Sequence, residues 1–221
     1  MRTMPPKIDI CIPTLLDDDQ VVPQMAEIDR NTLTPHRIIA SCQNVSAAMN
    51  RNFCLQWANS EIIISLDDDT ERFEPGWETR LIRPLLEIPD AMIVSARLMT
   101  ADNKPGPNCA DNYDLGPEPW REANHLVEVF QRHDGYIGIP TACIAFRKTP
   151  VRFDERFQGS GWEDAQFNFY MKRLMPQGRC FINNACRLVH ANHMVNQGGD
   201  NWKHNSELYW SLCKFPPEKT S

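Results

Sequence analysis

Long apolar segments are missing from this sequence of 221 residues. Its longest aliphatic stretches, such as Ile62–Ile64 and Ala91–Val94, are far shorter than the roughly 18 residues that cross a bilayer. Met1–Lys7 lead directly into a strand-like segment, without the apolar region of a signal peptide. We therefore expect no membrane span and a cytosolic location.

An excess of positive charge is also missing. The chain has 23 Lys and Arg against 29 Asp and Glu, a formal net charge of −6. Non-specific binding to nucleic acid depends on basic side chains that neutralise phosphates. The balance therefore argues against a protein that binds nucleic acid mainly through a basic surface, and it leaves a local basic groove open.

The eight cysteines include no C-x-x-C pair. Neither a zinc knuckle nor a small disulfide scaffold is indicated, and we interpret the cysteines as mostly reduced thiols in the cytosol. The rest of the composition, with 42% hydrophobic and 24% charged residues, is that of an ordinary globular protein. A chain of this length is expected to form one domain.

Strand-like and helix-like segments alternate between Ile8 and Leu66. The strand-like segments are Ile8–Ile12, Arg37–Ala40 and Glu61–Leu66, and the helix-like ones are Val21–Arg30 and Ala47–Ala58. The third strand-like segment is an almost continuous apolar run, which is typical of a strand buried on both faces. This alternation predicts an α/β fold, with helices on the faces of a mostly parallel sheet.

The second half of the chain begins with a long segment rich in Pro, Asn, Asp and Gly, residues 101–120. Its composition predicts a loop, and long loops inside compact domains are usually functional or mobile. Beyond it, Leu126–Phe130 and Ile137–Phe146 are predicted strands, the second at the antiparallel side of the sheet. Apolar residues at helical spacing predict an amphipathic helix that starts near Glu163.

Three consecutive aspartates, Asp67–Asp69, follow the buried strand directly. Ligands of α/β sheets bind at the carboxyl ends of the strands. Strand alternation would point Asp67 and Asp69 to one side and Asp68 to the other. Two converging carboxylates suit a hard divalent cation, and the alternative is a solvated acidic turn.

A glycine-rich turn, Gly159–Trp162, leads into Glu163 and Asp164 at the start of the predicted helix. The helix dipole stabilises a carboxylate at this position, so that it is available as a base. The alternative is that one of the two only caps the helix.

Two histidines, His190 and His193, lie close together near the end of the chain. A neutral imidazole could complete a metal site begun by an aspartate. A structural or exposed histidine is the alternative.

These motifs, in this chain order, resemble the family-two-like glycosyltransferases of the GT-A fold, a group with bacterial and phage members. The resemblance covers roughly residues 7–195. The segments that carry it are Ile8–Thr14, Ala47–Asn52, Ile62–Asp69 with its D-x-D, Ala145–Lys148, Phe153–Phe157 and Gly161–Asp164 with its E-D pair. It implies a single Rossmann-like domain, with a nucleotide-sugar half at about residues 1–100 and an acceptor and catalytic half at about 101–195.

The resemblance implies transfer of a sugar from a nucleotide sugar, typically a UDP-sugar, with Mn²⁺ or Mg²⁺ on the diphosphate. Asp69 would bind the metal, and Asp67 would contact the ribose or the metal through water. One of His190 and His193 would be the remaining ligand. Asp164 would be the base that deprotonates the acceptor hydroxyl, in an inverting displacement, and Glu163 would help to position the acceptor.

Further residues would contact the donor. By the resemblance, Pro13 and Thr14 line the nucleoside pocket, and the predicted donor site also includes Arg51, Asp68 and Trp162. Members of the family usually carry an acidic residue after the second strand, where this chain has Ser41–Asn44, so that recognition of uracil is in doubt. Asp17–Asp19 could replace that acid from the first loop, or they could form a solvated acidic loop.

The tail, residues 196–221, combines glycines with Trp202 and Lys203. We hypothesise that it forms a lid over the donor diphosphate, in which these two side chains contact the donor. The alternative is a flexible C-terminal segment.

The acceptor is the least defined part of the site. A platform formed by Trp120, Trp162, Tyr209 and Trp210 could stack a sugar ring or a base. The expected acceptor is a glycan or a lipid-linked sugar, and hydroxylated bases in DNA are an alternative. The oligomeric state is not indicated.

Two other classes of function stay open. A metal-dependent phosphohydrolase also places D-x-D after an apolar strand, but its common pattern lies in the first strand and has Thr or Val where this chain has Glu71. A nucleotide-sugar-binding module without catalysis is the other alternative.

Overall fold

The computed structural model describes residues 6–104, 126–129, 138–190 and 200–213. They form one mixed sheet in the strand order β2-β1-β3-β7-β5-β8-β4, with β6 also paired to β8. The strands are β1 (Ile8–Thr14), β2 (His36–Cys42), β3 (Ile62–Leu66), β4 (Thr70–Glu71), β5 (Ala91–Met99), β6 (Leu126–Val129), β7 (Cys143–Arg147) and β8 (Arg179–His190).

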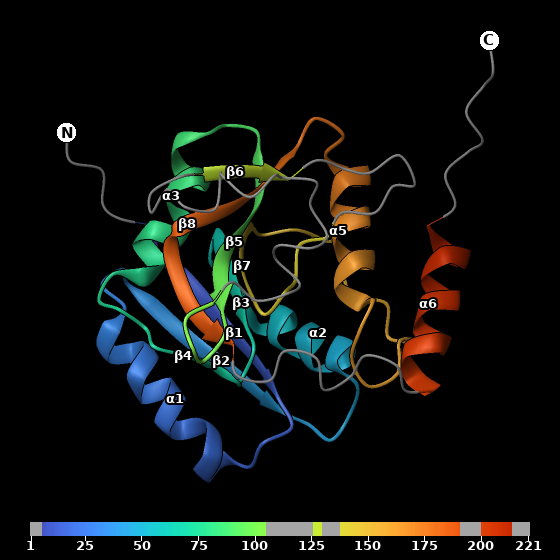
Figure 1. Cartoon of the computed structure of the whole chain (residues 1–221), viewed down its shortest axis with the longest axis horizontal. Helices are drawn as coiled ribbons and strands as arrows, with labels where there is room; N and C mark the ends of the chain where they lie inside the picture. Colours follow the sequence, from blue (N-terminus) through green and yellow to red (C-terminus); the bar gives the residue numbers. More distant parts are fainter. Residues whose placement is uncertain (1–5, 105–125, 130–137, 191–199, 214–221) are drawn as a thin grey trace.

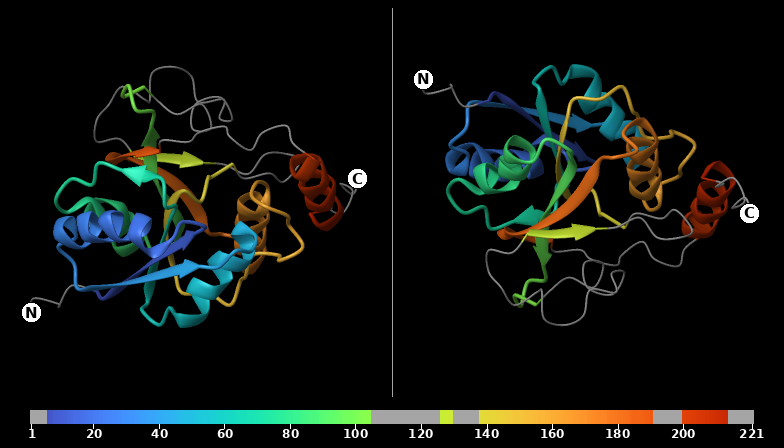
Figure 2. Two further views of the ribbon diagram at one scale, coloured as in Figure 1. Left: turned by 90° about the horizontal axis from the view of Figure 1, so that it is seen from below. Right: turned by 90° about the horizontal axis from the view of Figure 1, so that it is seen from above.

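Helices cover both faces of this sheet. They are α1 (Asp18–Asn31), α2 (Ala47–Trp57), α3 (Trp77–Glu87), α5 (Glu163–Leu174) and α6 (Asp200–Leu212). Figure 1 shows α1 and α3 on one face and α2 and α5 on the other, and both views of Figure 2 place α6 outside α5. Two separate groups of buried apolar side chains correspond to these two faces. The predicted α/β class, with helices flanking the sheet, is confirmed.

The first half of the fold follows the pattern in the sequence. β1 pairs in parallel with β2 on one side and with β3 on the other. All five residues of β3 are buried, as expected for an apolar run enclosed on both faces. The parallel arrangement brings the carboxyl ends of these strands to one edge of the sheet.

The second half differs from the sequence prediction in the place of β7. This strand is antiparallel, but it lies in the middle of the sheet, between β3 and β5, and it starts at Cys143 rather than Ile137. Strand order depends on contacts between distant segments, which local patterns do not report. The sequence argument also did not identify α3, β5 or β8 as elements.

The pairing of β4 with β8 determines the position of the acidic turn. These strands are antiparallel, and Thr70 of β4 lies opposite His190 at the end of β8. The turn Asp67–Asp69, which joins β3 to β4, is therefore brought beside a histidine more than a hundred positions later in the chain.

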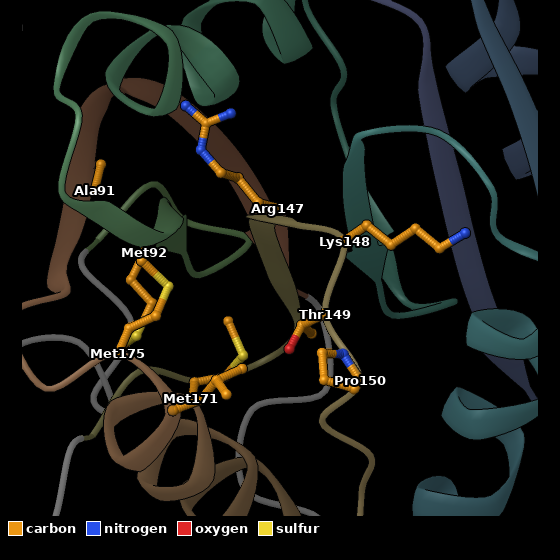
Figure 3. Close-up of a pocket in the computed structure, with 9 residues that line it drawn as sticks. Ala91, Met92, Arg147, Lys148, Thr149, Pro150, Met171 and Met175 are labelled. Carbon is orange, nitrogen blue, oxygen red and sulfur yellow. The ribbon is translucent and has the colours of Figure 1, made fainter.

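A small pocket lies at the other edge of the sheet, at the beginning of β5. Figure 3 shows Met92, Met171 and Met175 near one another in its lining, which also includes Arg147 and Lys148. It holds about 70 Å³, well below the 300–1,000 Å³ usual for ligand sites. We interpret it as a packing gap between methionine side chains.

Two expectations from composition can be compared with the described residues. None of their helices has the length and apolar character needed to cross a bilayer. Seven cysteines lie among these residues, which do not include Cys109, and six of the seven are buried.

Candidate active site

The acidic turn after β3 is held by its backbone. Gln24 of α1 donates from Nε2 to the carbonyl oxygens of Asp67 and Thr70, both at 3.0 Å. The Thr70 hydroxyl donates to the same Asp67 carbonyl at 2.7 Å. These bonds fix the turn without using its carboxylates, which are directed to other partners.

Asp67, Asp69 and His190 form a cluster in which one ligand atom from each lies within 4.8 Å of the others. His190 Nε2 is 2.9 Å from Asp69 Oδ1 and 3.9 Å from Asp67 Oδ2. Carboxylate oxygens suit both Mg²⁺ and Mn²⁺, whereas an imidazole ligand favours the transition metal. The donor set therefore fits a divalent cation.

The pKa of His190 reflects the charge of this cluster. Burial lowers the pKa, but the hydrogen bond to Asp69 and the charges of Asp67 and Asp69 outweigh burial and raise it overall. A proton on the imidazole thus partly neutralises the carboxylates. Because a metal needs the neutral imidazole, a divalent cation and this proton compete for the site.

Asp68 is bonded outside this cluster, but strand alternation is not the reason, because the three aspartates lie in the turn between β3 and β4. The buried Thr14 hydroxyl, at the end of β1, donates to Asp68 Oδ2 and accepts from the Leu16 amide at 2.8 Å. Burial raises the pKa of Asp68, and the charges of Asp67 and Asp69 add to this effect. Asp68 therefore joins the acidic turn to the loop after β1.

The loop after β2 is fastened to β1 by a buried amide, Asn50 of α2. Asn50 Oδ1 accepts from the Ser41 hydroxyl at 2.8 Å, and its Nδ2 donates to the carbonyls of Gln43 and Thr14 at 2.8 and 3.2 Å. In the first loop, Asp17 is the N-cap residue of α1 and its amide donates to Gln20 Oε1 at 3.2 Å. Asn50 thus connects the carboxyl end of β1 to the carboxyl end of β2 and the loop that follows it.

Arg51 joins the two carboxylate motifs. Its Nη2 donates to Asp67 Oδ1 at 2.8 Å and its Nη1 to Glu163 Oε1 at 2.7 Å, and both Arg51 and Glu163 are buried. Burial alone would lower the pKa of Arg51, but the surrounding charges of Asp67, Glu163 and Asp164 raise it. The guanidinium is therefore a fixed positive charge between the acidic turn and the start of α5.

Glu163 and Asp164 occupy the first turn of α5. Burial raises the pKa of Asp164 to about 7, with a further contribution from the charge of Glu163. Asp164 Oδ1 accepts from the Ala165 amide at 2.7 Å. A carboxylate with a pKa near neutrality is suited to accept a proton and release it again at physiological pH.

An aromatic cluster stands beside these carboxylates. The Trp162 ring centroid lies 5.4 Å from that of Trp202, 5.3 Å from Tyr209 and 6.1 Å from Trp210. Tyr209 is fully buried, so the expectation that it offers an open stacking surface is wrong. Its ring packs against Trp162, and Trp210 is exposed, at 40%. Trp120 lies outside the described residues.

The structure brings most of the predicted site residues to one edge of the sheet. Pro13 and Thr14 end β1, and Arg51 links the acidic turn to Glu163 and Asp164. His193 lies outside the described residues, and Lys203 is exposed on α6, in a segment that was expected to be a lid. The roles predicted for the other residues stay predictions.

Sequence reasoning missed three side chains that hold the site. Gln24, Asn50 and Asn205 are amides whose hydrogen bonds reach backbone groups far away in the chain. No local pattern distinguishes them from surface amides. Burial is the informative signal, since Asn50 and Asn205 are almost completely buried and a buried amide needs partners.

Comparison with known proteins gives a consistent picture. The model of the glycosyl transferase family 2 matches residues 15–190. The chain therefore belongs to glycosyl transferase family 2, and the predicted glycosyltransferase activity is confirmed at the level of the family. No curated protein matches the chain in sequence.

Solved structures with the same fold share little sequence with it. GalNAc-T7 with UDP, GalNAc and Mn²⁺ aligns with a TM-score of 0.60 and 10% identity, over 96% of this chain and 48% of that one. The chain thus spans about half of that protein's length. A mycobacterial protein aligns with 0.60 and 12%, over 96% and 76% of the two chains. Glucosyl-3-phosphoglycerate synthase from Mycobacterium tuberculosis, in complex with phosphoglyceric acid, aligns with 0.58 and 13%, over 96% and 82%. These likenesses establish the GT-A fold.

Proposed function

We propose that this glycosyltransferase uses a divalent cation, preferably Mn²⁺, to transfer a sugar from a UDP-sugar to an acceptor hydroxyl, with inversion at the anomeric carbon. The observation that carries the proposal is the link through Arg51 between the Asp67–Asp69–His190 cluster and the Glu163–Asp164 pair. Such a link would keep the proposed cation site and the proposed base at the same edge of the sheet.

Asp67, Asp69 and His190 would hold the cation. When bound, it would stabilise the negative charge that develops on a nucleoside diphosphate leaving group. Asp68, which lies between the two aspartates of the cluster, is bonded to Thr14 at the end of β1, where the nucleoside would bind. Pro13, Thr14 and the loop after β2 would then enclose the base and ribose. The GalNAc-T7 structure, which contains both UDP and Mn²⁺, supports this donor and this metal.

Asp164 would remove the proton from the acceptor hydroxyl as that oxygen attacks the anomeric carbon. Its pKa of about 7 is suited to this task. Glu163 Oε1 is held by Arg51, while Oε2 is buried and has no hydrogen-bond partner among the described residues. A buried acceptor atom needs a donor, and we propose that Oε2 takes a hydrogen bond from the acceptor substrate.

The test is release of UDP from a panel of UDP-sugars, each supplied with simple glycans or with hydroxymethylated DNA. We expect turnover with Mn²⁺, loss of turnover with a chelator, and transfer of the sugar to a glycan. Transfer to the DNA alone would replace the glycan acceptor. Release of phosphate from phosphate esters would favour a metal-dependent phosphohydrolase. Saturable donor binding without turnover would favour a nucleotide-sugar-binding module without catalysis. Either result would contradict the proposal.

A further inference from the structure

We infer that Asn205 of α6 is a positioning residue, which fixes the turn Gln158–Trp162 and thereby the placement of Asp164. The inference rests on the proposed role of Asp164. The inference gives α6 a different function from the lid suggested by the sequence. A helix that is bonded to the turn before Asp164 holds this turn in place, and we call it a brace.

The side chain of Asn205 is completely buried and bonds twice to one end of the turn and once to the other. Its Oδ1 accepts from the Gln158 amide at 2.9 Å. Its Nδ2 donates to the Gln158 carbonyl at 2.8 Å and to the Gly161 carbonyl at 3.0 Å. One side chain therefore closes both ends of the turn, directly before Glu163.

The turn needs this support because its backbone is unusual. Gly159, Gly161 and Trp162 have φ values of 59°, 105° and 71°. Glycine adopts such angles readily, but a tryptophan does so only where surrounding structure holds it there. Trp162 is also the N-cap residue of α5. The strained residue and the first carboxylate of the motif are thus neighbours in the chain.

Packing from α6 reinforces the hydrogen bonds. A Cβ atom on Gly161 would lie 2.9 Å from two ring carbons of Trp202, and one on Gly159 would lie 3.0 Å from Asn201 Nδ2. On the opposite side, the Ala47 amide at the start of α2 donates to the Gly159 carbonyl at 2.8 Å. The turn is therefore held between α2 and α6, and Asn205 supplies the hydrogen bonds from the α6 side.

The matched experiment compares Asn205→Ala with Asn183→Ala. Asn183 is likewise buried, and its side chain bonds to the Arg80 carbonyl at 2.8 Å and the Ala185 amide at 3.0 Å, away from the turn. We expect both variants to melt several degrees below the wild type, since each loses buried hydrogen bonds. Only Asn205→Ala should lower kcat, by roughly 10- to 100-fold, with the donor KM and the Mn²⁺ affinity within about twofold of wild type.

The pH profile adds a measurement that general loss of stability would not change. Asp164 is faced by Glu163 on its own helix, by Arg51 from α2 and by Asp67 after β3. Loosening the turn would admit water to Asp164 and lower its pKa. We expect the acidic limb of the kcat profile to move to lower pH in Asn205→Ala and to stay in place in Asn183→Ala.

Hydrogen exchange of the turn amides separates this inference from the proposed function, since it needs no turnover. If the wild type transfers no sugar but residues 158–164 exchange faster in Asn205→Ala than in Asn183→Ala, the proposed function fails and the brace holds. If exchange rises equally in both variants, or if kcat falls equally, Asn205 does not position the turn. An effect of Asn205→Ala on donor KM rather than on kcat would instead support a lid.

Discussion

The acidic turn Asp67–Asp69 and the turn Gly159–Trp162, which precedes Glu163 and Asp164 and is called the catalytic turn below, are held in different ways. The acidic turn joins two strands of the sheet, and β4 carries it directly against β8. The catalytic turn lies outside the sheet and depends on α2 and α6 for its shape. A site can thus combine one motif that the sheet positions with another that a distant helix positions.

This difference also separates what each motif would contribute. The sheet-bound turn would supply the cation ligands, together with His190. The helix-bound turn leads into the candidate base, Asp164. Arg51 is bonded to Asp67 and to Glu163, so it fixes the position of one motif relative to the other.

The largest expected effects come from one residue of each motif. Asp69→Ala should abolish Mn²⁺ binding and lower kcat/KM by more than about 100-fold, because a ligand is lost. Asp164→Asn should lower kcat by about 10²- to 10⁴-fold with Mn²⁺ binding unchanged, because only the base is lost. Isothermal titration with Mn²⁺ and initial rates of UDP release check both. Full activity in both variants would overturn the assignment.

The next effect concerns the shape of the catalytic turn. Gly161→Ala would place a methyl group 2.9 Å from the Trp202 ring, at a φ of 105° that alanine rarely adopts. We expect a loss of about 1–3 kcal/mol in the free energy of unfolding and a fall in kcat of about 100-fold.

Gly178→Ala is the matched control for this substitution. Its new methyl group would lie 2.8 Å from Met92 Sδ, far from the site, and would also strain the packing. Denaturant unfolding should show a loss of stability in both variants, while initial rates should show a loss of kcat only in Gly161→Ala. Equal kcat values would show that the shape of the catalytic turn does not matter for turnover.

A smaller effect is expected on the acidic turn. Gln24→Leu removes the hydrogen bonds to the Asp67 and Thr70 carbonyls. We expect Mn²⁺ affinity to weaken by about 10-fold, in the range typical of residues that orient metal ligands. Gln20→Ala on the same helix is the control, because the Gln20 side chain accepts from the Asp17 amide at the exposed start of α1, away from the acidic turn. Unchanged Mn²⁺ affinity in Gln24→Leu would mean that β4 and β8 alone fix the turn.

The last expected effect is on stability rather than on activity, and it concerns the pH dependence of the free energy of unfolding. Asp164 has a pKa of about 7 in the folded protein and a pKa near the ordinary aspartate value of 3.8 in the unfolded chain. Between these values the folded state binds more protons, so this residue makes stability fall as pH rises from about 4 to 7. Asp164→Asn removes this contribution. Without metal or donor, the variant should gain stability relative to wild type across this range in chemical unfolding. A constant difference would show that the pKa of Asp164 is not raised.

The sequence predicted the sheet-bound motif better than the helix-bound one. An apolar strand followed by Asp67–Asp69 is a local signal, and its position at a strand end follows from the α/β pattern. The pair Glu163–Asp164 was also predicted from the sequence. The left-handed backbone conformation of Trp162 and the burial of Asn205 were not. Their roles depend on contacts between α6 and a turn some 45 positions earlier.

Two further features could not be predicted from the sequence because they depend on the strand order. His190 could be proposed as a ligand from its chemistry, but its partner was fixed by the pairing of Thr70 with His190 across β4 and β8. The central place of β7 was likewise a property of the assembled sheet. Local patterns report which residues form elements, whereas these contacts arise only when distant elements pair.

Titration of the protein with Mn²⁺ during UDP release from the preferred UDP-sugar tests the central claim most directly. The account predicts that the wild-type rate rises to saturation with Mn²⁺ and that Asp69→Ala shows no such rise. Asp164→Asn should bind Mn²⁺ with wild-type affinity in the same buffer and still release almost no UDP. A wild-type rate that is independent of added Mn²⁺ and unaffected by a chelator would contradict the account.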